Sequence, residues 1–123
     1  MANKTLTIDS KKLSLNISGS GKPIILFHSL LADSSSFSPL EEDLVKTHQV
    51  ISLNLPGFEG SDFIGGDLNT IADHIAQGIN TLKLSDKPIF LGNGYGGFIA
   101  LITSIRHPQI ASRLVLADCG AMF

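Results

Sequence analysis

The sequence predicts an α/β fold: a mostly parallel open sheet of about six strands, with helices on both faces and a leading antiparallel hairpin. Three observations support this prediction. Short apolar runs alternate along the chain with stretches of helical periodicity, which is typical of strand–helix–strand units. The first two strand-like runs have alternating polarity, as in a hairpin. The length of 123 residues suits one domain, 1–123, and no linker interrupts it.

The hairpin is expected at the start of the chain. Leu6 and Ile8 alternate with polar residues, and Leu13, Leu15 and Ile17 repeat that pattern after a polar turn. Further on, short continuous apolar runs predict strands that are buried on both faces. These runs cover residues 23–28, 50–55, 89–91 and 113–117.

Helices are expected between these strands. Ser38-Pro39-Leu40-Glu41 has the pattern of a capping box with proline at the first helical position. Asp67 is a candidate N-cap, and apolar residues recur at helical spacing from 68 to 82. A third helix, 98–105, is apolar nearly all round and should end at His107, because the residue before a proline resists helical geometry.

Composition excludes several classes of function. Nine basic and eleven acidic residues leave no electrostatic footprint for nucleic acid. One cysteine excludes a disulfide framework, and few candidate ligands argue against a zinc site. No apolar run is long enough to span a bilayer, and the first residues lack the apolar core of a secretory signal. We therefore expect a cytoplasmic protein with no metal or cofactor.

A glycine-rich turn follows the strand at 89–91. Gly92, Gly94 and Gly97 satisfy the G-x-G-x-x-G pattern, and Asp118 lies 21 residues beyond Gly97 at the end of the next strand. That spacing fits a nucleotide-binding domain, with the acid placed for a ribose hydroxyl. However, the motif usually sits in the opening strand–helix unit, whereas only one strand follows here. Nucleotide binding is therefore an alternative interpretation.

A second interpretation uses more of the chain. Leu-Phe-His-Ser-Leu-Leu (26–31), Asn-Leu-Pro-Gly-Phe-Glu-Gly-Ser (54–61) and Leu-Gly-Asn-Gly-Tyr-Gly-Gly (91–97) occur in this order. They resemble the oxyanion loop, the Asp-x-Pro-Gly-x-Gly-x-Ser segment and the nucleophile elbow of the α/β-hydrolase fold family. Segments 106–108 and 114–118 also have counterparts there. The resemblance covers nearly all of the chain and corresponds to the N-terminal half of the family fold, so the chain looks like a truncated member. It implies the strand order 1-2-4-3-5-6.

The departures from the family pattern bear on activity. Gly94 stands where the elbow carries its nucleophilic serine, so no side chain is available to attack a substrate. Ser29 and Glu59 stand where the family has glycine. By resemblance, Asp118 matches the acid position of some members, such as haloalkane dehalogenases, but no histidine occupies the position of the base. We expect a pseudoenzyme whose ancestral chemistry is ester or carbon–heteroatom bond hydrolysis.

A non-catalytic role for the same place stays open. By resemblance, the backbone N–H groups of Leu30 and Tyr95 would form an oxyanion-type site for a small ligand or anion, next to His28 and Ser29. From the sequence, His28 is expected to be a packed or turn-bonding residue. The other three histidines, His48, His74 and His107, are expected at the surface or at helix ends, and Cys119 is expected to be structural.

The last predicted strand suggests a partner. Strand 113–117 would be an open edge, and apolar residues of strands 24–26, 89–91 and 114–116 would be partly bare. The chain is 43% apolar with a mean hydropathy of +0.26, which is high for a small monomer. We expect a homo-oligomer that buries this edge and face, helped by the tail 121–123. A partner chain that carries the absent half is the alternative.

Overall fold

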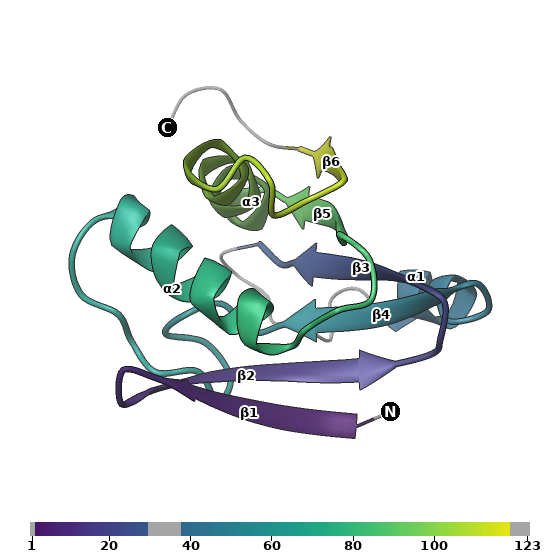
Figure 1. Cartoon of the computed structure of the whole chain (residues 1–123), viewed down its shortest axis with the longest axis horizontal. Coiled ribbons are helices and arrows are strands. Elements are labelled where there is room, and N and C mark those ends of the chain that lie inside the picture. The colour runs from purple at the N-terminus through teal and green to yellow at the C-terminus, as the bar shows by residue number, and fades with distance from the viewer. Residues whose placement is uncertain (1, 30–37, 119–123) are drawn as a thin grey trace.

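A computed structural model describes residues 2–29 and 38–118, and in it six strands form one sheet in the order β1-β2-β4-β3-β5-β6 (Figure 1). This confirms both the predicted fold class and the strand order. The strands are β1 (Ala2–Ile8), β2 (Lys11–Ser18), β3 (Lys22–Phe27), β4 (His48–Leu53), β5 (Ile89–Asn93) and β6 (Arg113–Ala117).

The leading hairpin is built on a two-residue turn. Asp9 and Ser10 both have positive φ, 50° and 68°, as a type I′ turn requires. β1 pairs antiparallel with β2, and β2 pairs antiparallel with β4. β4, β3, β5 and β6 are parallel to one another, so their carboxyl ends lie at one edge of the sheet.

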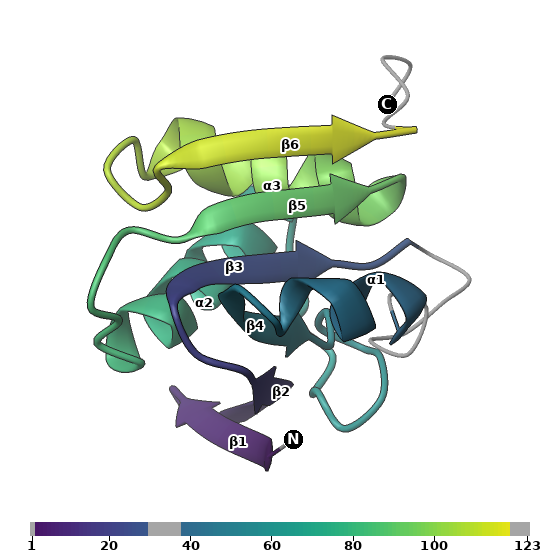
Figure 2. The same cartoon turned by 90° about the vertical axis from the view of Figure 1, so that its right-hand side faces the viewer.

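Helices cover both faces of the sheet. α1 (Ser38–Leu44) lies on one face, whereas α2 (Leu68–Thr81) and α3 (Tyr95–Arg106) lie on the other (Figure 2). The predicted cap of α2 is confirmed, because a carboxylate oxygen of Asp67 accepts the N–H of Thr70 at 3.0 Å. α3 ends at Arg106, with His107 as its C-cap next to Pro108, as expected.

The core is divided unequally between the two faces. The larger cluster lies under α2 and α3 and includes Phe27 and Phe90, whose ring centroids are 4.9 Å apart. A smaller cluster of Ile24, Leu26 and Val50 lies against α1. The expectation that strand 24–26 would be partly bare is wrong, because these residues are buried.

Glu41 has a different role from the one its spacing suggested. It is buried, and its carboxylate accepts a hydrogen bond from the hydroxyl of Ser52 on β4. The bond ties α1 to the sheet. Burying this carboxylate without such a donor would be unfavourable, because a charge loses its hydration inside the protein.

His74 corrects a sequence-based expectation. It was expected at the surface, but it is buried, and its Nε2 atom has no hydrogen-bond partner among the residues that the structure describes. The reason lies in the tertiary packing around α2. The β1–β2 hairpin packs along α2, where Gly78 lies against Leu13 and Ile8, so the buried face of the helix is wider than its apolar stripe.

β6 forms one end of the sheet and is the most exposed strand. It pairs with β5, and in the described part of the chain no strand lies on its other side. Val115 is 46% exposed and Leu116 is 39% exposed, although both are apolar. The tail 121–123, which was expected to help cover this edge, lies outside the described residues.

Candidate functional site

Residues from four strands meet at the carboxyl edge of the sheet. His28 and Ser29 follow β3, Leu55 lies just beyond β4, Gly94 follows β5 and Asp118 follows β6. Because the four strands are parallel neighbours, these ends lie side by side. This is the edge at which open α/β sheets bind their ligands.

The turn between β5 and α3 has a sharp, unusual backbone. Gly94 is the N-cap of α3, with φ 57° and ψ −124°. Its N–H donates to the carbonyl oxygen of Ala117 at 3.1 Å, which ties the turn to the end of β6. This backbone geometry is strained for a residue with a side chain, and only glycine adopts it without strain.

The other glycines of the turn are required by close backbone packing. A Cβ atom at Gly92 would overlap the backbone of Gly97, so the strand and the start of the helix lie in direct contact. A Cβ atom at Gly96 would overlap the carbonyl oxygens of Phe27 and His28 at the end of β3. Packing within the sheet therefore accounts for these glycines without a bound phosphate.

Ser29 lies directly in front of Gly94. A Cβ atom at position 94 would lie 3.2 Å from the Cβ atom of Ser29, which is tighter than ordinary van der Waals contact. The side chain of Ser29 thus borders the space into which a residue at position 94 would project. The sequence shows that positions 29 and 94 both depart from the family pattern. It does not show that the two residues are in contact, because they are far apart in the sequence.

His28 is held by the backbone on both sides of its ring. Its Nε2 atom accepts the N–H of Leu55 at 3.0 Å, so Nδ1 must carry the proton that is donated to the carbonyl oxygen of Ser29, 2.9 Å away. The ring is fully buried and meets Phe58 edge-on, with 4.9 Å between ring centroids. His28 therefore has the packed, turn-bonding role expected of it, and it joins the loops that follow β3 and β4.

A network of serines fixes the loop after β4, and sequence reasoning did not assign it a role. The hydroxyl of Ser61 donates to the carbonyl oxygen of Asn54 at 2.6 Å and accepts the N–H of Ser14 at 2.8 Å. The carboxylate of Asp62 accepts the N–H of Lys12 at 2.7 Å. Sequence analysis singled out segment 54–61 for its resemblance. In the structure, these hydrogen bonds fasten the loop to β2.

Tyr95 and Asp118 flank the turn. The phenol of Tyr95 is half-buried, and burial raises its pKa, so it stays neutral at physiological pH. Asp118 is exposed and has a φ of 49°, so it leaves the strand immediately after β6. Leu30 and Cys119 lie outside the described residues.

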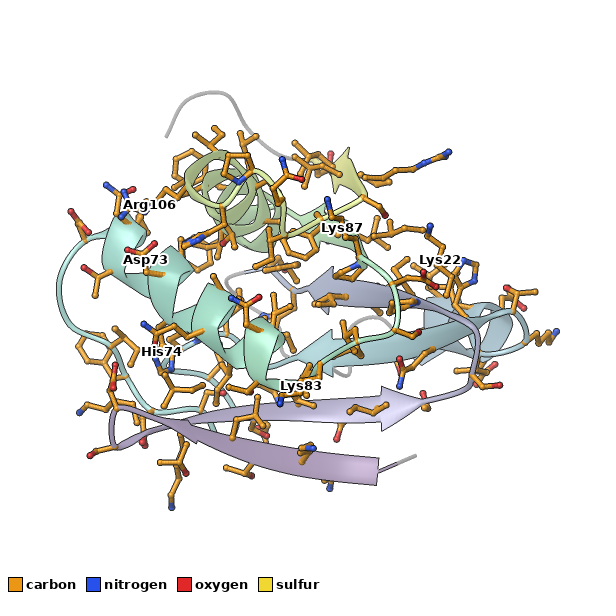
Figure 3. The ribbon with its side chains drawn as sticks, viewed as in Figure 1. Lys22, Asp73, His74, Lys83, Lys87 and Arg106 are labelled. Atoms are coloured by element: carbon orange, nitrogen blue, oxygen red, sulfur yellow. The ribbon has the colours of Figure 1, made fainter. Side chains whose placement is uncertain are left out.

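The other three histidines lie away from this edge. His48 begins β4 and His107 caps the far end of α3, where it contacts Asp73 at 2.8 Å. His74 lies between α2 and the hairpin (Figure 3). It lines a cavity of about 290 Å³ together with Asp9, Lys11 and Thr70.

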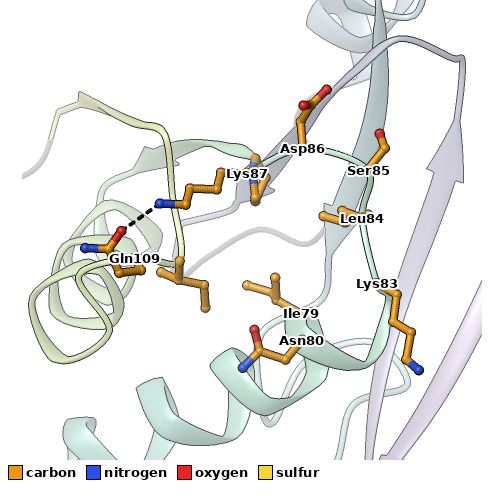
Figure 4. A pocket seen from close by; sticks show the side chains of 10 residues that line it. Ile79, Asn80, Lys83, Leu84, Ser85, Asp86, Lys87 and Gln109 are labelled. Carbon is orange, nitrogen blue, oxygen red and sulfur yellow. Dashed lines mark hydrogen bonds between the residues drawn. The ribbon is translucent and has the colours of Figure 1, made fainter.

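A second cavity, of about 350 Å³, lies at the opposite edge of the sheet. It is formed by the end of α2, the loop before β5 and the segment around Gln109 (Figure 4). Lys87 donates to the side-chain oxygen of Gln109 at 2.7 Å across its rim. The cavity is therefore remote from the turn at Gly94.

Within residues 2–29 and 38–118, no three histidine, cysteine, aspartate or glutamate side chains are grouped so as to hold a metal ion. No helix in those same ranges is long and apolar enough to cross a membrane.

Comparison with known proteins agrees with this arrangement. A family model described as the alpha/beta hydrolase fold matches residues 22–119. The chain is 34% identical over 114 residues to a pimeloyl-[acyl-carrier protein] methyl ester esterase from Shewanella woodyi, covering 93% of this chain and 42% of that protein. It is 28% identical to an (E)-2-((N-methylformamido)methylene)succinate hydrolase from Acinetobacter baylyi, covering 96% of this chain and 46% of that protein.

Solved structures give the same result. An esterase from Exiguobacterium antarcticum matches with a TM-score of 0.87 and 29% identity, over 98% of this chain and 46% of that one. The chain thus spans less than half the length of the relatives that it matches.

Proposed function

The chain belongs to the α/β-hydrolase fold family, and from that premise we propose that it is a hydrolase scaffold that catalyses no triad-based hydrolysis as it stands. The ancestral chemistry is ester or carbon–heteroatom bond hydrolysis. Relatives named as esterases and hydrolases support this assignment of chemistry. The proposal concerns the 123 residues of this chain and the edge of the sheet that they build.

One observation carries the proposal. The turn between β5 and α3 has the backbone shape that presents a nucleophile, with φ 57° and ψ −124°, yet Gly94 has no side chain there. Nucleophilic catalysis needs a hydroxyl, thiol or carboxylate at that point, with a base within hydrogen-bond reach. Tyr95 does not replace it, because burial raises the pKa of its phenol and disfavours the phenolate.

The histidines support the same conclusion. Both ring nitrogens of His28 are engaged with backbone atoms, so the ring has no free acceptor for a proton. His48 and His107 lie at the opposite ends of their elements from the turn. His74 is buried between α2 and the hairpin.

The test is a panel of p-nitrophenyl esters of increasing acyl length, assayed with the purified chain. We expect release of p-nitrophenol at the rate of the buffer alone. Gly94→Ser should not raise that rate, because none of the four histidines, all of which lie in the described part of the chain, is positioned to accept the hydroxyl proton. Ser29→Ala is the matched control, since Ser29 carries the hydroxyl next to the turn. Turnover by the unmodified chain that disappears in Ser29→Ala would contradict the proposal and identify Ser29 as the nucleophile.

A second candidate is binding of a small anion without catalysis. It is favoured by Tyr95, whose N–H lies in the first turn of α3 and has no acceptor within the helix, and by Ser29, which faces the adjacent Gly94. Acetate titrated into the ¹⁵N-labelled chain should shift the amide resonance of Tyr95, and Ser29→Ala should weaken the shift. Resonances that do not move would exclude this candidate.

Nucleotide binding is the third candidate, and it predicts heat in a calorimetric titration with NAD. We expect none, because close backbone packing already accounts for Gly92 and the left-handed backbone of the turn accounts for Gly94. Heat that is lost in Asp118→Ala would favour the nucleotide interpretation instead.

A further inference from the structure

We propose that the cavity between α2 and the β1–β2 hairpin binds a small organic cation, namely a primary ammonium ion with a short alkyl chain. The cavity measures about 290 Å³, which is close to the lower limit for ligand pockets and suits a small molecule. Its lining residues all lie between positions 8 and 77. The inference therefore depends neither on the turn at Gly94 nor on the proposed loss of catalysis.

A buried imidazole without a partner lines this cavity. His74 is 8% exposed, and its Nε2 atom has no hydrogen-bond partner among residues 2–29 and 38–118. Figure 3 shows His74 between α2 and the hairpin. Buried polar atoms are nearly always paired, because an unpaired atom has lost its bonds to water without replacement. Nε2 is itself covered, so the ring turns toward the cavity when a ligand N–H supplies the missing partner.

The protonation state of His74 suits a cationic ligand. Burial lowers the pKa of this imidazole, and the carboxylates of Asp9 and Asp62 oppose that effect only in part. The ring is therefore neutral at physiological pH. A neutral imidazole offers one nitrogen as a hydrogen-bond acceptor, so it can bind an N–H group without repelling a positive charge.

The neighbouring polar groups also accept hydrogen bonds. Asp9 contributes a carboxylate from the hairpin turn, and this carboxylate has no hydrogen-bond partner in the described part of the chain. The hydroxyl of Thr70 already donates its proton to Asp67 at 3.1 Å, so its oxygen is left to accept. Acceptors on the hairpin and on α2 approach from different directions. This arrangement suits the three tetrahedral N–H donors of an ammonium ion better than a flat guanidinium group.

The charges around the cavity favour a cation as well. Of the lining residues, Asp9 and Asp73 carry carboxylates, whereas Lys11 alone is cationic at neutral pH. The carboxylate of Asp73 is already paired with Arg106 at 2.7 Å. Asp9 is therefore the carboxylate that is available to a ligand, and Lys11 is the group that opposes a cation.

Apolar side chains provide a place for the alkyl chain. Ile8 and Ile64 line the same cavity and are 7% and 9% exposed. A short alkyl chain that packs against them buries apolar surface, which stabilises the complex. The ligand is thus expected to be amphipathic, with a charged head toward Asp9 and His74 and an apolar body beside the two isoleucines.

The first test is a titration of the isotope-labelled chain with n-butylammonium, followed by NMR at pH 7 and constant ionic strength. The ring nitrogen resonances of His74 and the amide resonances of Asp9 and Thr70 should move together and saturate. Butan-1-ol and butyrate are the matched probes, because they keep the alkyl chain but carry a neutral or an anionic head. Neither should produce this set of shifts.

The second test changes the charges at the cavity. Asp9→Asn should weaken butylammonium binding about fivefold, as for a partly screened ion pair. Asparagine tolerates the positive φ of 50° at this position, so the hairpin turn is retained. Lys11→Gln should instead strengthen binding, and a general loss of structure cannot produce opposite effects in the two variants. Asp43→Asn, which removes an exposed carboxylate on α1, is the control and should bind as the unmodified chain does.

The third test needs no variant. A bound cation next to the imidazole disfavours protonation, so the pH at which the His74 ring takes up a proton should be lower with butylammonium than without it. The ring resonances of His74 report this midpoint directly. His48, at the start of β4, should titrate at the same pH in both samples.

Four results would overturn the proposal. The first is a His74 ring whose resonances stay in place at every concentration of butylammonium. The second is an equal response to butan-1-ol. The third is an affinity that is unchanged in Asp9→Asn or weaker in Lys11→Gln. The fourth is a midpoint of His74 that butylammonium does not move.

Discussion

Ser29 and Gly94 act as a coupled pair at the turn between β5 and α3. At position 94 the φ of 57° strains any residue with a side chain, and an added Cβ atom would lie only 3.2 Å from the Cβ atom of Ser29, so Ser29 would have to move by a few tenths of an ångström. The missing side chain at position 94 and the side chain of Ser29 on the neighbouring loop thus face each other in one steric arrangement.

This coupling makes a prediction for stability. Gly94→Ser should lower the free energy of unfolding by about 1–3 kcal/mol, because it adds both backbone strain and the contact with Ser29. Adding Ser29→Gly should recover the part due to the contact but not the part due to strain. Urea unfolding of the two single variants and the double variant measures the coupling. Additive effects would show that the two positions act independently.

His74 predicts how stability depends on pH. Burial lowers the pKa of His74 in the folded chain, while the carboxylates of Asp9 and Asp62 partly oppose this effect. The unfolded chain, with a histidine pKa near 6.5, therefore takes up a proton at a higher pH than the folded chain does. The free energy of unfolding should fall as the pH decreases through about 6.5, and it should continue to fall until the folded-state pKa is reached.

His74→Leu should remove this slope between pH 7.5 and 5.5, since leucine does not titrate. His48→Gln, at a half-buried position at the start of β4, is the control and should keep the slope of the unmodified chain. Thermal unfolding followed across that pH range distinguishes the two outcomes. A slope that persists in His74→Leu would assign the effect to another group.

Among the contacts between helices, Asp73 connects α2 with α3. Its carboxylate accepts from Nε and Nη2 of Arg106 at 2.8 and 2.7 Å, and it contacts Nε2 of His107 at 2.8 Å, so it joins α2 to the end of α3 (Figure 3). The hydrogen bonds from Arg106 and then His107 lower the pKa of Asp73 from 3.8 to about 2.

Because this pKa is depressed in the folded state, its contribution to stability is complete above pH 4 and is lost as the pH falls toward 2. Asp73→Asn should lower the free energy of unfolding at pH 7 by less than about 1 kcal/mol, since the carboxylate is 37% exposed and water screens it. The difference between the variant and the unmodified chain should vanish near pH 2. Asp43→Asn, which affects an exposed pair with Lys46, should have little effect at any pH.

The helices and strands show how much of the fold can be predicted from the sequence. Alternation and continuous apolar runs located the six strands, helical periodicity located two helices, and the capping-box pattern located the helix that begins at Ser38. Asp67 was identified because an N-cap is a local pattern. The strand order came from the resemblance. The burial of His74, the bond from Ser52 to Glu41 and the contact of Ser29 with Gly94 were not predicted, because each joins segments that are distant in the sequence. The turn itself was predictable, but its steric coupling was not.

For the whole molecule, the unequal cores predict unequal sensitivity to mutation. Phe90 is fully buried in the large cluster under α2 and α3, whereas its neighbour Leu91 is half-buried on the other face. Phe90→Ala should lower the free energy of unfolding by about 3–5 kcal/mol, as expected for a large cavity in a packed core. Leu91→Ala should have a clearly smaller effect. Chemical denaturation compares them, and equal losses would mean that both faces support the fold equally.

Gly92 and Gly96 are required because a Cβ atom at either position would overlap neighbouring backbone, whether or not any substrate is ever cleaved. Natural selection for folding alone is therefore enough to preserve the bend over evolutionary time. A protein can lose its catalytic residues and still keep the glycines of this turn. The glycine pattern alone is therefore poor evidence that a related protein is active.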